Sequence, residues 1–576
     1  MLTSSIRIAA MVATMFGVCL AVGQEKPPVA SSTNRKAESP ADTDAKSHLP
    51  SLPQDCYLPK AYTDVFGNGK AIRSIRVTPE GFCVVAVGED GTLRSWHPKT
   101  RQPQFVSGAG FSPCQQIVPT ALGRLTAVFA MAHVERATRA TRTDKPVTDT
   151  DIWMSIGVGG QWRRLATAPG RAPSFDASRD GKWVVTTAGT PTVRLWDVST
   201  GREVRQFFHA YRGTNDKADR EVDIYGAVFA PDGKTFVSWG RGGRYAWHWD
   251  VNTGEKIKSL NLEMNWRAHI VFSPDSRTFF ALRATSGDPF SCDPSTGRKN
   301  YFKETFIDGF GSSQGDVSEI AISPDGKLLV TAGFESAPKG KGGTGPSVRL
   351  WETITGQEVE RASVPAGSLA FTPDGQTLIA GCTDGSLLFW KWAQRLPGDA
   401  GGAVIASAPG APKSAWESLG DAVAVNGQRA VRTLIANPTE AVGLLESRLA
   451  AVPIPEQSVV ARLIDALGHR GFAERERAQR DLGAYRESIR KELTVAAQGH
   501  TSSEARQRCR QLLTVIDGPM DIERLRSLRA VQALEGIGTP AANKLLEKLS
   551  RGAQGVVETE DARGALRRLN QQLFSR

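Results

Sequence analysis

The segment AISPDGKLLVTAG at residues 321–333 has the pattern of a β-strand, a tight turn and a second strand, and near-copies of it recur along the chain. Pro-Asp-Gly favours a sharp reversal, because proline presets φ, aspartate bonds to nearby backbone and glycine accepts positive φ. The turn position falls on glycine or, once, serine in seven copies: Gly81, Gly123, Gly181, Gly233, Ser276, Gly326 and Gly375. Such copies, about 50 residues apart, are typical of a propeller or another repeat array.

Each copy continues into a second hairpin. In five copies the next strand ends in tryptophan, at Trp96, Trp196, Trp249, Trp351 and Trp390. A turn such as DVSTGREV or ETITGQEV then leads to a fourth strand. Strands such as LLVTAG are apolar on both faces, so both faces must be covered, and radially stacked four-stranded blades achieve this.

The motifs SPDG, VRLWD and TG-x-x-V at this period resemble WD40 repeats. The resemblance implies a seven-bladed WD40 β-propeller over residues 58–396. The Gly-His dipeptide of that family is missing from this region, and Cys292 replaces the fifth tryptophan. We therefore expect the family's hydrogen-bonded tetrad to be mostly incomplete, with packing holding the blades. The strand-like AYTDVF at 61–66 is predicted to complete the seventh blade.

The strand pattern stops at a Gly/Ala/Pro-rich linker, residues 397–413. Residues 414–576 have apolar side chains at helical spacing and predict an α-helical, HEAT-like domain. In IGTP at 537–540, Gly538 should end one helix, Thr539 cap the next and Pro540 begin it. The fold class is mainly β, with a seven-bladed propeller followed by this all-α domain.

The N-terminus predicts export. Residues 1–23 have an early Arg7, an apolar run and small residues before Gln24, the pattern of a cleaved signal peptide. The run is too short for a membrane span, so none is expected after cleavage. Residues 24–57 are rich in Pro, Ser, Thr, Ala and Lys and predict a disordered linker. The mature chain resembles exported WD40 proteins abundant in planctomycete-type bacteria, which implies a periplasmic or cell-envelope location.

Charge and cysteine usage restrict the partners. The formal net charge is +11, but the charges of the C-terminal part are interleaved along its helices. Nucleic acid is therefore disfavoured as a partner, while an anionic envelope polymer stays open. The six cysteines beyond the signal peptide have no CxxC or metal-ligand spacing, and most should be buried apolar residues. Export permits disulfides, which stay open as well.

The histidines and cysteines form no motif for catalysis, since the chain lacks HExxH and CxxCH. KGKGGTGPS at 339–347 has the wrong order for a phosphate-binding loop, and we interpret it as a hairpin insertion. A second insertion at 135–151 carries Arg136, Arg139 and Arg142 and has the composition of a solvated loop. We predict no catalytic, cofactor-binding or metal-binding residue and no cofactor.

The sequence thus predicts a non-catalytic scaffold that binds proteins of the cell envelope through its propeller faces and helical domain. The alternative is a propeller-based hydrolase of the lactonase, glycosidase or peptidase type. Such an enzyme needs clustered carboxylates, histidine ligands or a nucleophile–base pair near the central axis. No Asp, Glu or His recurs at the positions where the blades begin, so the chain is not expected to be an enzyme.

Overall fold

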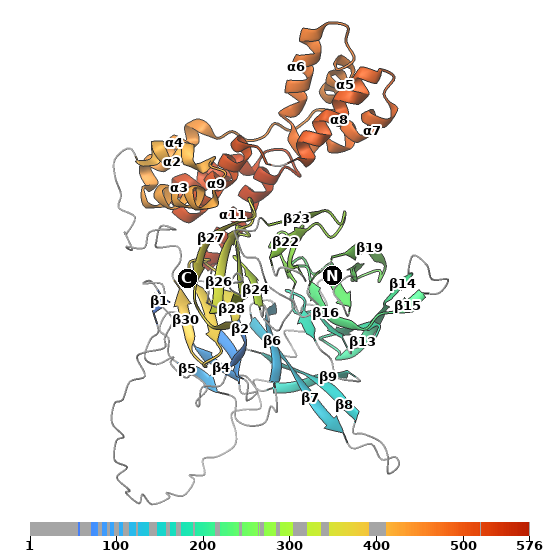
Figure 1. Cartoon of the computed structure of the whole chain (residues 1–576), viewed down its shortest axis with the longest axis vertical. Coiled ribbons are helices and arrows are strands. Elements are labelled where there is room, and N and C mark those ends of the chain that lie inside the picture. The colour runs from blue at the N-terminus through green and yellow to red at the C-terminus, as the bar shows by residue number, and fades with distance from the viewer. Residues whose placement is uncertain are drawn as a thin grey trace, which may run out of the picture. The chain divides into compact units, whose positions relative to one another are not determined.

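The structure is a computed structural model that describes most of the chain from residue 56 onward. The described residues are 56–57, 71–78, 83–88, 93–96, 103–106, 114–122, 125–136, 147–156, 162–168, 174–187, 190–212, 219–240, 245–262, 264, 270–283, 288–302, 319–335, 345–390, 411–518 and 520–574. They are mainly β, with antiparallel sheets followed by a helical region (Figure 1). The predicted signal peptide, 1–23, lies outside them.

Seven four-stranded antiparallel sheets occur within the described residues, and in six of them the strands pair in chain order. Sheets 1 and 2 comprise β2 (Ile72–Val77), β3 (Val84–Gly88), β4 (Leu93–Trp96) and β5 (Pro103–Val106), then β6 (Cys114–Leu122), β7 (Leu125–Arg136), β8 (Val147–Ile156) and β9 (Trp162–Ala168). Sheets 3 and 4 comprise β10 (Phe175–Ala177), β11 (Trp183–Thr187), β12 (Thr192–Asp197) and β13 (Arg202–Phe208), then β16 (Ile224–Phe229), β17 (Thr235–Gly240), β18 (Tyr245–Asp250) and β19 (Lys256–Asn261).

Sheets 5 and 6 comprise β20 (Val271–Phe272), β21 (Phe279–Leu282), β22 (Pro289–Cys292) and β23 (Lys299–Tyr301), then β24 (Glu319–Ile322), β25 (Leu328–Glu335), β26 (Gly345–Glu352) and β27 (Gln357–Ala362). Sheet 7 comprises β28 (Ala366–Phe371), β29 (Leu378–Cys382), β30 (Leu387–Trp390) and β1 (Cys56–Tyr57). A separate hairpin, β14 (Ala210–Arg212) with β15 (Asp219–Glu221), follows sheet 3.

The repeated hairpin of the sequence corresponds to these sheets. The degenerate copy inferred around Gly123 is confirmed, because β6 pairs with β7 up to Leu122 and Leu125. The predicted tryptophans lie at or next to the ends of the third strands, and Cys292 ends the third strand of sheet 5. Most strands of the sheets are buried on both faces, as the apolar pattern required.

The N-terminal strand that completes sheet 7 is not the one predicted. Cys56 and Tyr57 pair with Trp390 and Phe389 of β30. The segment proposed for this place, 61–66, lies outside the described residues. Cys56–Tyr57 also falls within the predicted linker 24–57, so the last two residues of that segment form a strand rather than disordered chain.

Neighbouring sheets contact one another through their first strands. β28 contacts β2, β2 contacts β6, β6 contacts β10 and β10 contacts β16, and β20 contacts β24, which contacts β28. Sheets 4 and 5 share one hydrophobic cluster that includes Trp239 and Phe279. The cores therefore lie between the sheets as well as within them, which fits the burial of the inner strands on both faces, whereas the outer strands β13 and β19 are largely exposed.

The helical region contains two cores. One is built by α2 (Ala411–Leu419), α3 (Ala424–Ala436), α4 (Pro438–Arg448), α9 (Ile522–Ile537), α10 (Pro540–Ser550) and α11 (Val557–Phe574). The other, inserted between α4 and α9, is built by α5 (Gln457–Ala466), α6 (Phe472–Gly483), η3 (Arg486–Ile489), α7 (Arg490–Gly499) and α8 (Ser503–Asp517). Figure 1 shows α5 to α8 as a separate group of helices.

This arrangement differs from the linear stacking expected of a HEAT-like array. Helix α9 packs against α2 and α3, about a hundred residues earlier, as well as against α10 and α11. Its buried residues lie around the whole helix, so α9 is the centre of the first core. The predicted joint at 537–540 is confirmed, since Gly538 has a φ of 59° and the Thr539 side chain accepts a hydrogen bond from the backbone of Ala542.

Cysteines and hydropathy agree with a packed molecule. Cys83, Cys292, Cys382 and Cys509 are buried and unpaired, which confirms the prediction for these four. Burial raises the pKa of Cys83 and Cys509 to about 11, so these thiols are unreactive near neutral pH. Among the described helices, none is long and apolar enough to cross a membrane.

Gly201 provides a test of how the sheets are spaced. Its φ is +67°, and a Cβ placed there would lie 2.5 Å from the carbonyl oxygen of Leu165 in the preceding sheet. We expect Gly201→Ala to lower the free energy of unfolding by about 1–3 kcal/mol, since both the backbone angle and the contact oppose it. Thermal and denaturant unfolding measure the change.

Gly443 in α4 is the matched control, because no atom lies within 4 Å of its added Cβ. Gly443→Ala should leave stability unchanged or raise it by up to about 1 kcal/mol, since alanine favours the helix. Equal effects of the two substitutions would contradict the close approach of sheets 2 and 3.

Candidate functional site

The turns of sheets 3 to 7 lie at one end of the strands of each sheet. In an antiparallel four-stranded sheet, the connection between the first two strands and that between the last two leave at the same end of the strands. We call the surface formed by these turns the turn face. It comprises the Pro-Asp-Gly-type turns at 178–182, 230–234, 273–277, 323–327 and 372–376 and the Thr-Gly turns at 197–202, 250–255, 293–298 and 352–357.

Four of the five Pro-Asp-Gly-type turns share one hydrogen-bond pattern, seen in sheet 5, and the turn of sheet 4, which begins with Ala230, lacks the hydroxyl. The hydroxyl of Ser273 donates to Asp275 Oδ1 at 2.6 Å, and the backbone N–H of Arg277 donates to the same oxygen at 3.1 Å. Ser178, Ser323 and Thr372 make the equivalent bonds in their sheets. The aspartate thus serves its own turn first, which explains its recurrence without catalysis.

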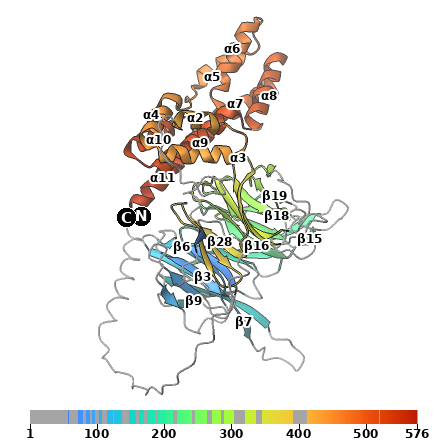
Figure 2. The ribbon, with the colours of Figure 1, turned by 60° about the vertical axis from the view of Figure 1, so that its left-hand side comes forward.

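The turn face of sheet 6 holds the helical region. Arg529 of α9 donates from Nη2 to Glu352 Oε2 at 2.6 Å and from Nε to Oε1 at 2.8 Å, and both side chains are fully buried. Gln428 of α3 donates to Glu352 Oε1 at 2.7 Å. The Arg529 guanidinium also donates to the carbonyls of Leu419 and Asp421, each at 2.7 Å. Figure 2 shows α3 beside the sheets.

Two further contacts extend this joint. Gln532, one turn after Arg529 on α9, donates to Asp325 Oδ2 at 3.3 Å, and Lys327 pairs with Asp561 of α11. Gly427 of α3 lies so close that a Cβ there would be 2.1 Å from the Arg529 guanidinium. The joint is therefore an interface within the chain, at which side chains from the turns of one sheet bind side chains of helices.

Sequence reasoning missed this joint, although one signal was present. The Thr-Gly turns of sheets 3, 4 and 5 begin with Asp197, Asp250 and Asp293, whose Oδ1 atoms accept hydrogen bonds from their own turns. In sheet 6 the same position is Glu352, one methylene longer. The longer side chain reaches Arg529 instead of bonding to the backbone of its own turn.

Sheet 4 contains a hydrogen-bond network that the sequence analysis expected to be incomplete. His209 Nε2 lies 2.7 Å from Ser238 Oγ, and Trp249 Nε1 donates to the same oxygen at 3.0 Å. In sheets 3 and 6, Trp196 and Trp351 donate to a threonine at 2.9 and 3.1 Å. Sheet 4 joins three groups and sheets 3 and 6 join two each, so among the described residues the four-membered network is mostly incomplete, as expected, although packing is not the only interaction within these sheets. The sequence signal was the lone His209 after the fourth strand of sheet 3.

The first strands carry a charged cluster that was also missed. Arg76 of β2 lies 3.9 Å from Glu319 of β24, and Asp176 of β10 accepts a hydrogen bond from the backbone of Phe229 at 2.8 Å. Although Asp176 keeps some access to solvent, the surrounding protein raises its pKa to about 6, partly opposed by the Phe229 bond and the charge of Arg76. This cluster links sheets 1, 3, 4 and 6.

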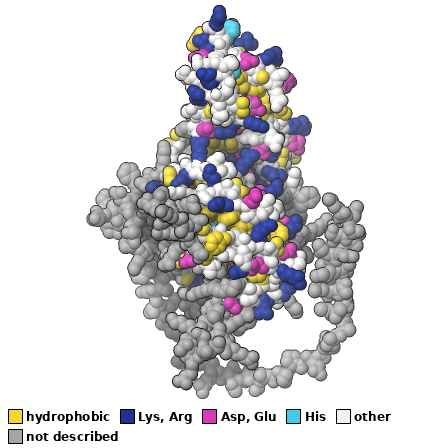
Figure 3. All heavy atoms as spheres, turned by 90° about the vertical axis from the view of Figure 1, so that its right-hand side faces the viewer, with side chains coloured by type: hydrophobic (Ala, Val, Ile, Leu, Met, Phe, Trp, Pro, Cys, Tyr) yellow, Lys and Arg dark blue, Asp and Glu magenta, His cyan; other side chains and the backbone are white. Residues whose placement is uncertain are grey.

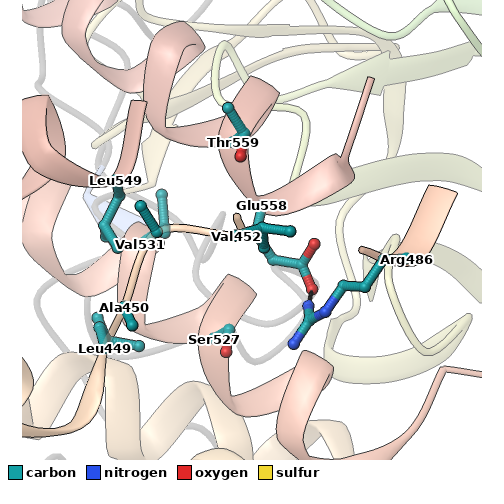
Figure 4. A pocket seen from close by; sticks show the side chains of 10 residues that line it. Leu449, Ala450, Val452, Arg486, Ser527, Val531, Leu549, Glu558 and Thr559 are labelled. Carbon is teal, nitrogen blue, oxygen red and sulfur yellow. Dashed lines mark hydrogen bonds and ion pairs between the residues drawn. The ribbon is translucent and has the colours of Figure 1, made fainter. Parts of the chain in front are cut away.

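A small pocket lies within the helical region (Figure 4). It is open to solvent, and its empty volume of roughly 350 Å³ includes part of that solvent. It is lined by Leu449, Ala450, Ala451, Val452, Arg486, Ser527, Val531, Leu549, Glu558 and Thr559. Arg486 pairs with Glu558, which Arg524 also approaches at 3.4 Å. Desolvation and the nearby Arg524 lower the pKa of Arg486. The charged side chains at this pocket therefore pair with one another within the protein.

The other predicted features give no site. Within the described residues, no group of three or more His, Cys, Asp or Glu side chains could hold a metal ion. Residues 137–146 and 336–344, which contain most of the two predicted insertions with Arg139 and Arg142, lie outside the described part. On the face in Figure 3, basic and acidic side chains are interspersed rather than segregated.

Comparisons with known proteins agree with the repeat pattern. The WD40 family (WD domain, G-beta repeat) matches residues 358–391, from β27 to the residue after β30. A guanine nucleotide-binding protein subunit beta of Arabidopsis thaliana is 25% identical over 345 residues, which is 57% of this chain and 82% of that protein. The corresponding protein of Solanum tuberosum is 23% identical over 344 residues, with the same shares. These matches support a WD40 repeat protein. In WD40 terms, sheets 1 to 7 are blade-like units.

His209 and Asp176 should titrate with opposite effects on stability. Burial lowers the pKa of His209 to about 4, from 6.5. Between these values the unfolded chain binds a proton that the folded chain does not, so stability falls as pH falls. Asp176 does the reverse, because its pKa rises from 3.8 to about 6 and its folded form gains stability as pH falls. Each group contributes about 3 kcal/mol, so their effects nearly cancel.

Single substitutions should separate the two groups. Asp176→Asn leaves His209 alone, so acidification from pH 7 to pH 4.5 should destabilise this variant by about 2–3 kcal/mol more than the parent chain. His209→Gln should show the opposite difference. Denaturant midpoints at each pH measure both, and Asp374→Asn in an exposed turn is the control. Parallel pH profiles for all variants would contradict the assigned pKa directions.

The joint is tested by removing one partner or both. Glu352→Met leaves the buried Arg529 charge unpaired and should lower the free energy of unfolding by about 3–5 kcal/mol. Glu352→Met combined with Arg529→Met removes both charges and should recover much of that loss. Denaturant unfolding measures each variant. As a control, Arg477→Ala breaks an exposed pair with Asp481 and should change stability by less than about 1 kcal/mol. Additive losses in the double variant would contradict a buried, mutually dependent pair.

Proposed function

We propose that this WD40 repeat protein is a non-catalytic scaffold that binds other proteins through the turn face of its sheets and through its helical region. The observation that carries the proposal is the joint at sheet 6. There the turn face binds helices through a buried bidentate Glu352–Arg529 pair and a Lys327–Asp561 pair. A surface that recognises helices within the chain has the chemistry to recognise helices of a partner.

The relatives support the same function. The matched plant proteins are described as subunits, that is, as members of assemblies. The part of this chain that matches them corresponds in length to its sheet region. We therefore place the partner-binding function in the sheets, with the helical region as an addition specific to this chain type.

We further propose that the seven sheets close into a seven-bladed propeller over the predicted residues 58–396, with β1 (Cys56–Tyr57), just ahead of that range, completing the last blade. Contacts between successive first strands, including β28 with β2, and the pairing of β1 with β30 support closure. The remaining predicted segments stay part of this proposal with two corrected bounds: the linker predicted at 24–57 ends before the strand at Cys56, and the linker predicted at 397–413 ends where α2 begins at Ala411, ahead of the helical domain predicted at 414–576.

The proposed location is the periplasm or cell envelope, with residues 1–23 removed before Gln24, as in the exported planctomycete-type proteins that the chain resembles. The N-terminal pattern supports this. Mass spectrometry of the mature protein from cell fractions tests it. An intact N-terminus in the cytoplasmic fraction would exclude export.

Affinity capture tests the scaffold function. The bait is the mature chain, residues 24–576, incubated with envelope extract at low and at physiological salt, and contacts are mapped by chemical cross-linking. A bait with Glu352→Met alone, which leaves the buried Arg529 charge unpaired and weakens the joint, shows whether the helical region takes part. We expect the bait to retain one or a few proteins that form cross-links to the turn face.

Retention of an anionic envelope polymer, with no protein, would replace the protein partner. Retention of nothing by either bait would contradict the scaffold. A hydrolase screen with lactone, glycoside and peptide substrates tests the alternative, and turnover that is lost in Asp176→Asn would support an enzyme.

A further inference from the structure

The turn face of sheet 6 is one member of a set of equivalent turns. Its Pro-Asp-Gly turn presents Asp325 and Lys327, and its Thr-Gly turn presents Glu352. Sheets 3 and 4 present the same types of side chain at the same places: Asp180, Lys182 and Asp197 in sheet 3, and Asp232, Lys234 and Asp250 in sheet 4. What occupies the turns of sheet 6 therefore indicates what the others can bind.

The occupied turns define a simple recognition pattern. Arg529 and Gln532 are three residues apart on α9, so both project from the same side of the helix. Arg529 binds the carboxylate of the Thr-Gly turn, and Gln532 binds the aspartate of the Pro-Asp-Gly turn. Asp561 of α11, a second helix, binds the lysine that follows that turn.

The equivalent side chains of sheets 3 and 4 are accessible. Asp180, Lys182, Asp232 and Lys234 are exposed, whereas Lys327 is buried under the helices. Asp197 and Asp250 bond to their own turns through Oδ1. Among the described residues, the second oxygen of each accepts no hydrogen bond, as would be needed to receive a guanidinium.

The two turn pairs form one continuous surface. Arg205 of β13 donates from Nη1 to the carbonyl of Asn252 in the Thr-Gly turn of sheet 4 at 2.9 Å. The Pro-Asp-Gly turns also touch, since a Cβ on Gly233 would lie 3.8 Å from the Ser178 side chain. A partner protein that presents two helices could therefore contact the turns of sheets 3 and 4 at once.

We propose that the turn face of sheets 3 and 4 docks a helical protein partner that presents an Arg-x-x-Gln pair to the turn carboxylates and a carboxylate to Lys182 or Lys234. The proposal rests on the scaffold function and assigns it a surface and a partner chemistry. The alternation of aspartate and lysine favours a protein with both charges over an anionic polymer, which the aspartates would repel.

The experiment uses the mature full-length chain and a defined probe. The probe is a hydrocarbon-stapled, alanine-rich helical peptide that carries Arg and Gln three residues apart, a fluorophore and a photo-cross-linker. A peptide with alanine at both positions is the matched control. Fluorescence anisotropy measures binding, and mass spectrometry locates the cross-links. We expect cross-links within residues 178–202 and 230–255 and binding that weakens with salt.

Variants of the chain test the receptor side. Asp197→Asn with Asp250→Asn keeps an oxygen for the turn hydrogen bonds while removing both charges, so the fold should be retained, which thermal unfolding checks. Binding of the probe should weaken about tenfold. Asp374→Asn in sheet 7 is the matched control and should bind as the parent does.

The proposal is overturned if the alanine peptide binds as well as the probe, or if the double variant binds unchanged. Self-association of the chain that the double variant abolishes would instead assign this face to a second copy. If the probe fails while a captured envelope protein cross-links elsewhere, the scaffold function stands and only this surface is excluded. If both fail, neither proposal survives.

Discussion

The buried pair of Glu352 and Arg529 is the interaction on which the arrangement of this protein depends. Both side chains are removed from water, so neither charge is tolerated without the other. The pair is satisfied further by Gln428 and by backbone carbonyls of Leu419 and Asp421. Because these partners come from the sheets, from α3, from α9 and from the connection after α2, one ion pair fixes four segments that are distant in the sequence.

The same turns explain how the sheets are arranged. A carboxylate at the start of each Thr-Gly turn holds the turn in shape, and its glycine lies against the fourth strand of the preceding sheet, as Gly201 does against Leu165. The turn thus serves both the local reversal and the contact with the neighbouring sheet. Replacing aspartate by glutamate in sheet 6 gives up the backbone bond and gains a contact with a distant helix. In sheet 6 the longer side chain thus reaches a helix of the same chain.

The sheet pattern was predictable because it depends on local chemistry that is repeated. Pro-Asp-Gly turns and apolar strands predicted even the degenerate copy at β6 and β7, where only Gly123 marked the turn. The pairing of β1 with β30 was predictable in kind but not in position, since a two-residue strand carries almost no pattern. The insertion of α5 to α8 between α4 and α9 depends on contacts between residues about a hundred positions apart, which helical periodicity does not encode.

The charged sites were harder to predict for a physical reason. Arg76, Asp176 and Glu319 come from different sheets, and each is unremarkable in its own strand. Only the folded arrangement of the sheets brings them together, and desolvation by the surrounding protein raises the pKa of Asp176. The equivalent turns are easier to recognise from the sequence, because each one repeats the same set of charged side chains within a short segment. For repeat proteins of this kind, the informative signal is therefore the position at which one copy departs from the others, as Glu352 does.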